Sequence, residues 1–166
     1  MWAASVTGMA TIRLARPEEA AALTALCIRS KAHWGYDARF MRQAAAALTI
    51  SAGMIEAGRV LVAESQGGNL LGVAAVEELD TAGGFDLALL FVEPAAIRTG
   101  IGHALFAACV RVAATEGGKC LSILADPFAE AFYKKLGAVR IGEAPSDAIP
   151  GRLLPLLEYR IDDPHP

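Results

Sequence analysis

One stretch near the middle of the chain constrains the fold more than any other. An apolar run, Phe85–Val92, is followed by a glycine-containing turn, a helical pattern from about Gly100 to Glu116, and a second apolar run, Cys120–Ala125. Two strands joined through a helix in this way form a β-α-β unit with parallel strands and a right-handed crossover. The continuous apolar character of Phe85–Val92 also predicts a strand that is buried on both faces.

The rest of the chain supplies shorter elements on both sides of this unit. The patterns predict a strand Ala10–Ala15, helices from Pro17 to Ala32 and from Asp37 to Leu48, strands Arg59–Glu64 and Leu70–Glu77, a helix Glu130–Leu136, and strands Val139–Gly142 and Leu154–Ile161. The order β-α-α-β-β-β-α-β-α-β-β predicts an α/β (α+β) fold, with a central mixed sheet flanked by about four helices. We expect one domain over residues 10–161, a flexible leader over 1–9 and a flexible tail over 162–166.

Composition and charge exclude several classes of protein. With 54% hydrophobic and 20% charged residues, the chain is not intrinsically disordered. Its net charge of −3 and the lack of a basic block argue against a nucleic-acid partner. Charge-free stretches such as Ala44–Ile55 are shorter than the roughly 18–20 residues of a membrane span. The three cysteines have no C-x-x-C spacing and read as reduced core residues, so we expect a cytoplasmic protein without a metal.

The turn that enters the central helix is the best candidate for a binding site. After Val92 come Glu93 and Pro94, and the predicted loop then consists of Arg98, Thr99, Gly100, Ile101, Gly102 and His103. Glycines let the backbone approach a bulky anion, and the free N–H groups of a first helical turn favour negative charge. The pattern predicts a phosphate-binding loop, and a plain tight turn is the alternative. Neither a Walker loop nor the dinucleotide fingerprint fits the residues that follow Gly102.

A later segment makes the combination specific. Ala129, Phe132, Tyr133 and Gly137 form an A-x-x-F-Y-x-x-x-G pattern roughly thirty residues after the loop. Together with the V-x-P strand end and the G-x-G helix entrance, it resembles the GNAT superfamily of acetyl-CoA-dependent N-acetyltransferases. The resemblance covers about Thr11–Ile161.

The sequence departs from the family pattern at the loop. The family has Q/R-G-x-G-x-G/A there, whereas this chain has Ile97 in place of Gln or Arg and Arg98 in place of the first glycine. Arg98 could add a phosphate contact, but a positive φ at this position would weaken cofactor binding.

The resemblance implies acetyl-CoA as a co-substrate and a set of residues that bind it. Pantetheine would pair with the strand backbone, the diphosphate would lie at the loop, Asp126 stands where the family often has Asn, and Tyr133 would donate a proton to the departing sulfur. The implied cofactor-binding residues are Leu90, Phe91, Val92, Arg98, Thr99, Gly100, Ile101, Gly102, His103, Asp126 and Tyr133.

The acceptor side carries fewer signals. The carboxylates near the expected cleft are Glu77, Glu78, Asp86 and Glu93. Glu93 is the preferred base because it lies where the strand opens toward the thioester, and proton removal through water is the alternative. Trp34 and Tyr36 offer flat faces for an amine, although both residues could instead seal the core. Asp37 is expected to cap the second helix.

These residues predict an N-acetyltransferase that moves the acetyl group of acetyl-CoA to a primary amine by direct transfer in a ternary complex. The alternative is a non-catalytic acyl-CoA-binding sensor, favoured by the altered residues Ile97 and Arg98. We expect a small-molecule or peptide amine as the acceptor, no nucleic acid and no membrane. The apolar stretch Leu153–Leu157 could form a homodimer contact.

Overall fold

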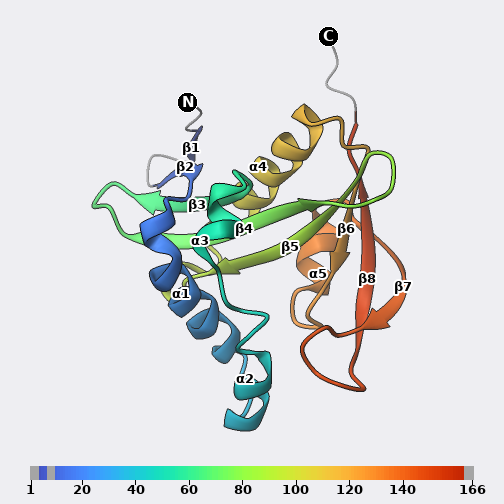
Figure 1. Ribbon diagram of the computed structural model, residues 1–166, viewed down its shortest axis with the longest axis horizontal. Helices are drawn as coiled ribbons and strands as arrows, with labels where there is room; N and C mark the ends of the chain where they lie inside the picture. The colour runs from blue at the N-terminus through green and yellow to red at the C-terminus, as the bar shows by residue number, and fades with distance from the viewer. Residues whose placement is uncertain (1–3, 7–9, 163–166) are drawn as a thin grey trace.

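The computed structural model describes residues 4–6 and 10–162, which form one mixed sheet with helices on both of its faces (Figure 1). The elements are β1 (Ala4–Val6), β2 (Ala10–Leu14), a 3₁₀ turn η1 (Pro17–Glu19), α1 (Ala20–Ala32), α2 (Ala38–Ala44), α3 (Ala52–Glu56), β3 (Val60–Ser65), β4 (Leu70–Glu78), β5 (Gly84–Val92), a 3₁₀ turn η2 (Pro94–Ala96), α4 (Ile101–Thr115), β6 (Cys120–Leu124), α5 (Glu130–Lys135), β7 (Val139–Pro145) and β8 (Leu153–Arg160).

The sheet has the strand order β1-β2-β3-β4-β5-β6-β8-β7. The pair β5–β6 is parallel and every other neighbouring pair is antiparallel. This arrangement confirms the predicted mixed sheet and the central β-α-β unit, in which α4 connects the two parallel strands.

Two hydrophobic clusters hold the layers together. On one face, Leu23 and Leu26 of α1 and Ile55 of α3 pack with side chains of β3, β4 and β5. On the other face, Leu105 and Phe106 of α4 belong to the same cluster as Tyr133 of α5. The sheet therefore separates α1–α3 from α4 and α5, and each face has its own core.

The parallel contact between β5 and β6 is short. It covers only Gly84–Asp86 against Cys120–Ser122, after which the two strands separate. We call the opening between them, beyond Asp86, the fork. A register shift between Ala75 and Val76 of β4 leaves Ala88 of β5 without a directly opposite residue, which is a β-bulge at the start of the fork. The edge of β5 that faces the fork therefore presents backbone N–H and C=O groups to the space between the strands.

The structure differs from the sequence predictions in several places, and α2 ends at Ala44 although the predicted helix extended to Leu48. Residues 4–6 of the expected flexible leader form β1, while the remaining leader residues and the tail residues 163–166 lie outside the described part of the chain. The short helix α3 was not predicted, although its Ser51 cap, which accepts a bond from the Met54 amide at 3.2 Å, is a local signal for it. Residues 90–92 of β5 are only half-buried, because the fork exposes them.

Candidate active site

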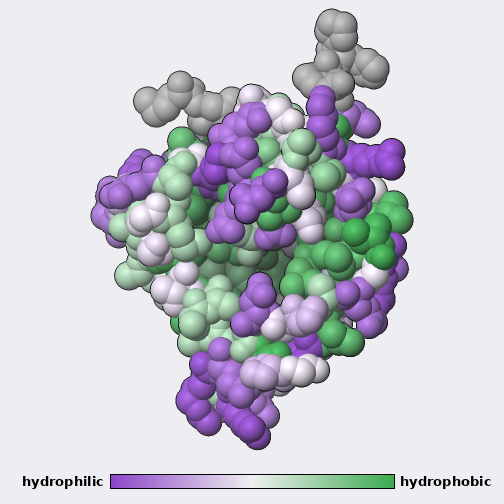
Figure 2. All heavy atoms as spheres, turned by 45° about the vertical axis from the view of Figure 1, so that its right-hand side comes forward, coloured by the Kyte–Doolittle hydropathy of each residue, from purple (hydrophilic) through white to green (hydrophobic). Residues whose placement is uncertain are grey.

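A cavity of about 560 Å³ occupies the fork. Its walls are residues 86–92 of β5 and 123–126 of the β6 end, and its other sides are formed by α1, α2, α5, the start of α4 and the loop before β8. The face shown in Figure 2 is hollowed near its centre, where apolar residues line a recess with hydrophilic residues at its rim. A concave, mostly apolar cavity with a few polar groups is the usual form of a ligand site.

The start of α4 lies at one end of this cavity, and Arg98, Gly100, Gly102 and His103 are among the residues that line it. The first intrahelical hydrogen bond of α4 is donated by the Ala104 amide to the Gly100 carbonyl at 3.1 Å. The preceding amides of the first turn therefore have no carbonyl of the helix to bond, and with the helix dipole they favour an anion. The start of α4 therefore offers to the cavity the backbone amides that a phosphate-binding loop needs, and phosphate binding itself stays a prediction.

Two residues of this loop have a left-handed backbone. Gly100 has φ +89°, which glycine adopts at little cost, and a Cβ there would meet nothing within 4 Å. Arg98 has φ +66° and is the only non-glycine residue with a positive φ among residues 10–162. The Thr99 hydroxyl donates to the Ala96 carbonyl and braces the turn, and the Ile101 side chain is buried in the core. Thr99 and Ile101 can thus offer a ligand only their backbone groups.

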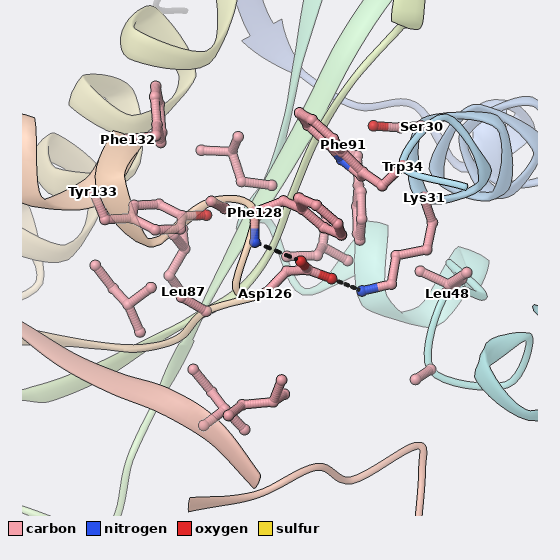
Figure 3. Close-up of a pocket in the computed structure, with 18 of the residues that line it drawn as sticks. Ser30, Lys31, Trp34, Leu48, Leu87, Phe91, Asp126, Phe128, Phe132 and Tyr133 are labelled. Carbon is pink, nitrogen blue, oxygen red and sulfur yellow. Dashed lines mark hydrogen bonds and ion pairs between the residues drawn. The ribbon is translucent and has the colours of Figure 1, made fainter. Parts of the chain in front are cut away.

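Tyr133 lies between the two ends of the cavity. It belongs to α5, is only 6% exposed, and its hydroxyl points toward the middle of the cavity in Figure 3. Burial raises the pKa of Tyr133, and Cys109 and Asp126 add to this effect. The hydroxyl therefore keeps its proton at neutral pH and can donate it within the cavity.

Glu93 lies outside the cavity lining. Its carboxylate accepts two hydrogen bonds from the Arg29 guanidinium, at 2.9 and 2.8 Å. These bonds lower the pKa of Glu93, which makes its carboxylate a weaker proton acceptor. This geometry disfavours the predicted role of Glu93 as the catalytic base.

Three carboxylates line the cavity, those of Asp86, Asp126 and Asp147, and Asp86 lies at the base of the fork. It is half-buried, and burial raises its pKa to about 6, with further contributions from Glu77 and Asp147. A carboxylate with a pKa near the working pH is suited to accept a proton. The sequence named Asp86 among the candidates, but it gave no reason to prefer this residue over Glu93.

Four side chains from distant parts of the chain form a polar network, which we call the clasp: Lys31, Tyr36, Asp126 and Arg152. Lys31 Nζ lies 2.6 Å from Asp126 Oδ2, and Tyr36 Oη donates to the same oxygen at 2.7 Å. Arg152 Nη2 donates to Tyr36 Oη at 2.8 Å and lies 3.8 Å from Asp126 Oδ2. The clasp joins α1 and the α1–α2 corner to the turn after β6 and to the loop before β8.

The clasp changes the interpretation of two predicted residues. Burial alone would raise the pKa of Asp126, but hydrogen bonds from Lys31, the Phe128 amide and Tyr36 outweigh it and lower the pKa. Figure 3 shows the bonds from Lys31 and the Phe128 amide. Asp126 is therefore an ionised carboxylate that already has protein partners. Tyr36 uses its hydroxyl in the clasp and stacks its ring on Phe40, with centroids 3.9 Å apart.

Aromatic side chains cover the same end of the cavity. The rings of Trp34 and Phe128 stack with centroids 5.1 Å apart and 7° between their planes, and both side chains remain exposed. Trp34 lines the cavity, and its acceptor-side role stays a prediction; its partner Phe128 had no distinguishing signal in the sequence. Asp37 accepts a hydrogen bond from the Phe40 amide at 2.8 Å, which confirms its predicted capping role.

Among the residues that the structure describes, no group of three or more His, Cys, Asp or Glu side chains is arranged to hold a metal ion. Within the same part of the chain, no helix has the length and apolar character that a membrane span needs.

Solved structures with this fold are numerous. A GCN5-related N-acetyltransferase from Rhodopseudomonas palustris matches with a TM-score of 0.74 and 22% identity, over 95% of this chain and 99% of that chain. The PaiA N-acetyltransferase from Thermoplasma acidophilum, in complex with coenzyme A, matches with a TM-score of 0.73 and 15% identity, over 91% and 98%. YncA, a putative acetyltransferase from Salmonella typhimurium with acetyl-CoA, matches with a TM-score of 0.67 and 21% identity, over 96% and 98%.

No curated protein matches the chain by sequence. A family model described as the acetyltransferase (GNAT) domain does match, and it covers residues 17–148. That range includes the fork, the start of α4 and α5 with Tyr133, which are the elements that build the cavity. The chain therefore belongs to the GNAT acetyltransferase family.

Proposed function

We propose that this protein is an N-acetyltransferase that moves the acetyl group of acetyl-CoA to an amine by direct transfer in a ternary complex. The observation that carries the proposal is the cavity in the fork, which has an anion-binding helix start at one end and a carboxylate, Asp86, at its base. The family supports acetyl transfer in general. The amine acceptor and the ternary complex are the parts that we add.

The residues at the start of α4 fit coenzyme A. The free amides of residues 101–103 would hold the diphosphate, and the unpaired edge of β5 at Leu90–Val92 would bond the pantetheine amides. Two of the structurally similar proteins were solved with coenzyme A or acetyl-CoA, which supports the same ligand here. Acetyl-CoA, as the co-substrate, supplies an acetyl thioester.

The chemistry needs a neutral amine and a proton for the leaving sulfur. A bond forms between the amine nitrogen and the carbonyl carbon, the carbon–sulfur bond breaks, the amine loses one proton and the thiolate sulfur gains one. Tyr133 is the proton donor in this proposal, because its hydroxyl points toward the middle of the cavity, as Figure 3 shows, and tyrosine is protonated at neutral pH. In this proposal a backbone N–H of β5, near the bulge at Ala88, would donate to the developing oxyanion.

We assign proton acceptance to Asp86 instead of Glu93. Asp86 lines the cavity, whereas Glu93 is held by Arg29 outside the lining. The pKa of Asp86, about 6, leaves the carboxylate mostly ionised at pH 7 and still basic enough to take a proton.

The direct test measures free coenzyme A thiol while the protein is incubated with acetyl-CoA and a panel of primary amines. We expect amine-dependent thiol release and an N-acetylated product of matching mass. Thermal denaturation with coenzyme A gives a second readout, since a ligand at 100 times its Kd stabilises by about 2.7 kcal/mol. Stabilisation by coenzyme A without any product from a broad panel would overturn the proposal of catalysis.

That same outcome would support the alternative, a non-catalytic acyl-CoA sensor. The observation that favours the sensor is the backbone of Arg98, a non-glycine residue with φ +66° in the cofactor loop. A protein in which neither product nor stabilisation is seen would have neither function.

Two further expectations remain proposals: a cytoplasmic location and a homodimer. The stretch Leu153–Leu157 cannot act as one continuous apolar contact, because Leu157 is fully buried and Leu153 is 59% exposed. An interface on this edge would use Leu153 together with the exposed side chains of Val139 and Ile141 on β7.

A further inference from the structure

The clasp holds an unequal number of charges. Lys31 and Arg152 are both cationic, and Asp126 is the single carboxylate between them. The three side chains are only 15%, 20% and 16% exposed, so most of their surface is removed from water. Burial pushes the pKa of Tyr36 to about 12, which keeps its phenol neutral and leaves one positive charge uncompensated. An uncompensated charge in such a place is costly, and an anion beside it is correspondingly favoured.

The two cations also have unused hydrogen-bond donors. Lys31 spends one of its three N–H groups on Asp126, and Arg152 spends Nη2 on Tyr36. Within residues 10–162, the Nε and Nη1 atoms of Arg152 have no acceptor in hydrogen-bond range. Both side chains line the cavity, so these donors are within reach of a molecule that enters it. The N–H bonds of Nε and Nη1 point in different directions, so each of these atoms can donate a single charge-assisted hydrogen bond to a carboxylate.

The other charged side chains that line the cavity form two groups outside the clasp. Arg98 and His103 belong to the α4 end, where the diphosphate of coenzyme A is proposed to bind. Asp86 and Asp147 both line the cavity and form an acidic end, and the charge of Asp147 contributes to the raised pKa of Asp86. The acceptor side therefore has an acidic part, suited to an amine, and a basic part formed by the clasp.

We propose that the acceptor is an amino-carboxylate, a molecule whose amine faces Asp86 and whose carboxylate is bound by Arg152 and Lys31. This inference rests on the proposed function, and it assigns the clasp as the specificity-determining part of the same site. Between the two charged parts the wall is apolar, with Trp34, Phe40 and Leu48 among its residues. The acceptor accordingly carries an apolar body, as an amino acid with an aromatic or aliphatic side chain does.

The experiment compares amines that differ only by a carboxylate. The pairs are phenylalanine with phenethylamine, leucine with isopentylamine, and 6-aminohexanoate with pentylamine. In at least one pair, kcat/KM for the carboxylate-bearing member should exceed that of its partner by about 10- to 100-fold, the range of a hydrogen bond to a charged group. Phenylalanine amide keeps the body and the amine but lacks the charge, and it should behave like phenethylamine.

Variants of Arg152 then test whether this side chain causes the preference for a carboxylate. Arg152→Gln should remove the advantage of the carboxylate, with the loss appearing in the KM of the acceptor and leaving the KM of acetyl-CoA unchanged. Arg152→Lys, which retains the positive charge, should keep part of the advantage of the carboxylate-bearing amine. Arg39→Gln is the matched control, because Arg39 is an exposed cation on α2 outside the cavity and its loss changes the net charge equally.

The outcomes separate this inference from the proposed function. Acetylation of the amines with no preference for a carboxylate in any pair overturns the inference and leaves the acetyltransferase intact. A preference that persists in Arg152→Gln also overturns it, as does an equal rise in the KM of acetyl-CoA, which would place Arg152 on a phosphate. If no amine is acetylated, calorimetry with the N-acetylated member of each pair still tests recognition, and equal affinity with and without the carboxylate overturns the inference.

Discussion

The two ends of the cavity are built in different ways. At the α4 end, the ligand-facing groups are backbone amides, and their placement depends on a left-handed turn at Gly100 and a helix start only a few residues long. At the acceptor end they are side chains, contributed by residues as far apart as Lys31, Asp126 and Arg152. Backbone groups offer the same chemistry in any sequence that folds there, whereas side chains can be exchanged. Under the proposed function, the α4 end would bind the co-substrate common to the family, and the acceptor end would determine which amine is used.

The largest effect is expected from Asp86, at the acceptor end. Asp86→Asn removes the proposed base, and we expect kcat to fall by about 100-fold or more while coenzyme A affinity is retained. In the unchanged protein, activity should rise with pH through about 6, as the carboxylate loses its proton. Steady-state thiol release between pH 5 and 8 checks both. A variant that keeps the same rising limb would remove Asp86 from proton transfer.

Asp86→Asn should lower kcat but raise the stability of the fold at neutral pH. Because the folded-state pKa of Asp86 lies above the ordinary value, ionisation of this carboxylate destabilises the fold as the pH rises through 4 to 6. Asp86→Asn should therefore be more stable at pH 7 by about 1 kcal/mol, a value reduced for partial exposure, and no more stable below about pH 4. Urea unfolding at the two pH values measures the difference.

Tyr133 lies between the two ends of the cavity, and its substitution tests whether its hydroxyl is the proton donor. Tyr133→Phe should lower kcat by about 10- to 100-fold and leave the Kd of coenzyme A unchanged, because only the proton donor is lost. Tyr159→Phe is the control, since Tyr159 packs on Phe106 outside the cavity. Equal turnover of Tyr133→Phe and the unchanged protein would show that this hydroxyl takes no part in the reaction.

Substitution of Asp126 tests whether the turn after β6 acts at the cofactor end or at the acceptor end of the cavity. The family resemblance assigns this position to the cofactor, whereas the structure joins it to Lys31 and Tyr36. Asp126→Asn should lower the free energy of unfolding by about 1–3 kcal/mol at pH 7 and raise the KM of the acceptor. If coenzyme A affinity falls and the acceptor KM does not, the residue belongs to the cofactor end.

The pH dependence of that loss has a defined direction. The pKa of Asp126 is lowered in the folded protein, so its contribution is complete above about pH 4 and disappears as the pH falls through the lowered value. Thermal unfolding of Asp126→Asn should therefore be less sensitive to acid. Glu143→Gln, which removes an exposed ion pair with Arg140, serves as the control and should change stability by about 0.5 kcal/mol or less.

The smallest effect concerns Arg98 at the α4 end. Arg98→Ala and Arg98→Gly both remove the charge, but only glycine relieves the backbone strain at φ +66°. The glycine variant should be the more stable by about 1 kcal/mol and should bind coenzyme A at least as well as the alanine variant. Denaturant unfolding and calorimetry measure the two quantities, and an alanine variant as stable as glycine would show that the turn holds no strain.

The parts of the molecule that the sequence predicted are those with local causes. The turn at Gly100 and the cap at Asp37 depend on neighbouring residues, and continuous apolar runs mark the two strands of the central β-α-β unit. The role of Glu93 could not be judged locally, because its partner Arg29 is 64 positions away. The clasp could be predicted even less from neighbouring residues, because Tyr36 and Arg152 are separated by 116 positions. Partners brought together by the fold have no periodicity or motif by which a sequence could show them.

The three residue pairs that join β5 to β6 have a consequence for how a small chain accommodates a long co-substrate. An enzyme usually places its cleft between domains or on loops above a continuous sheet. Here the sheet itself divides: β5 and β6 pair over three residues and then separate, while the core on the α4–α5 face contains residues from both parts of the sheet. A long, thin molecule can therefore lie deep within the protein and meet backbone groups along its length, without a second domain to close over it.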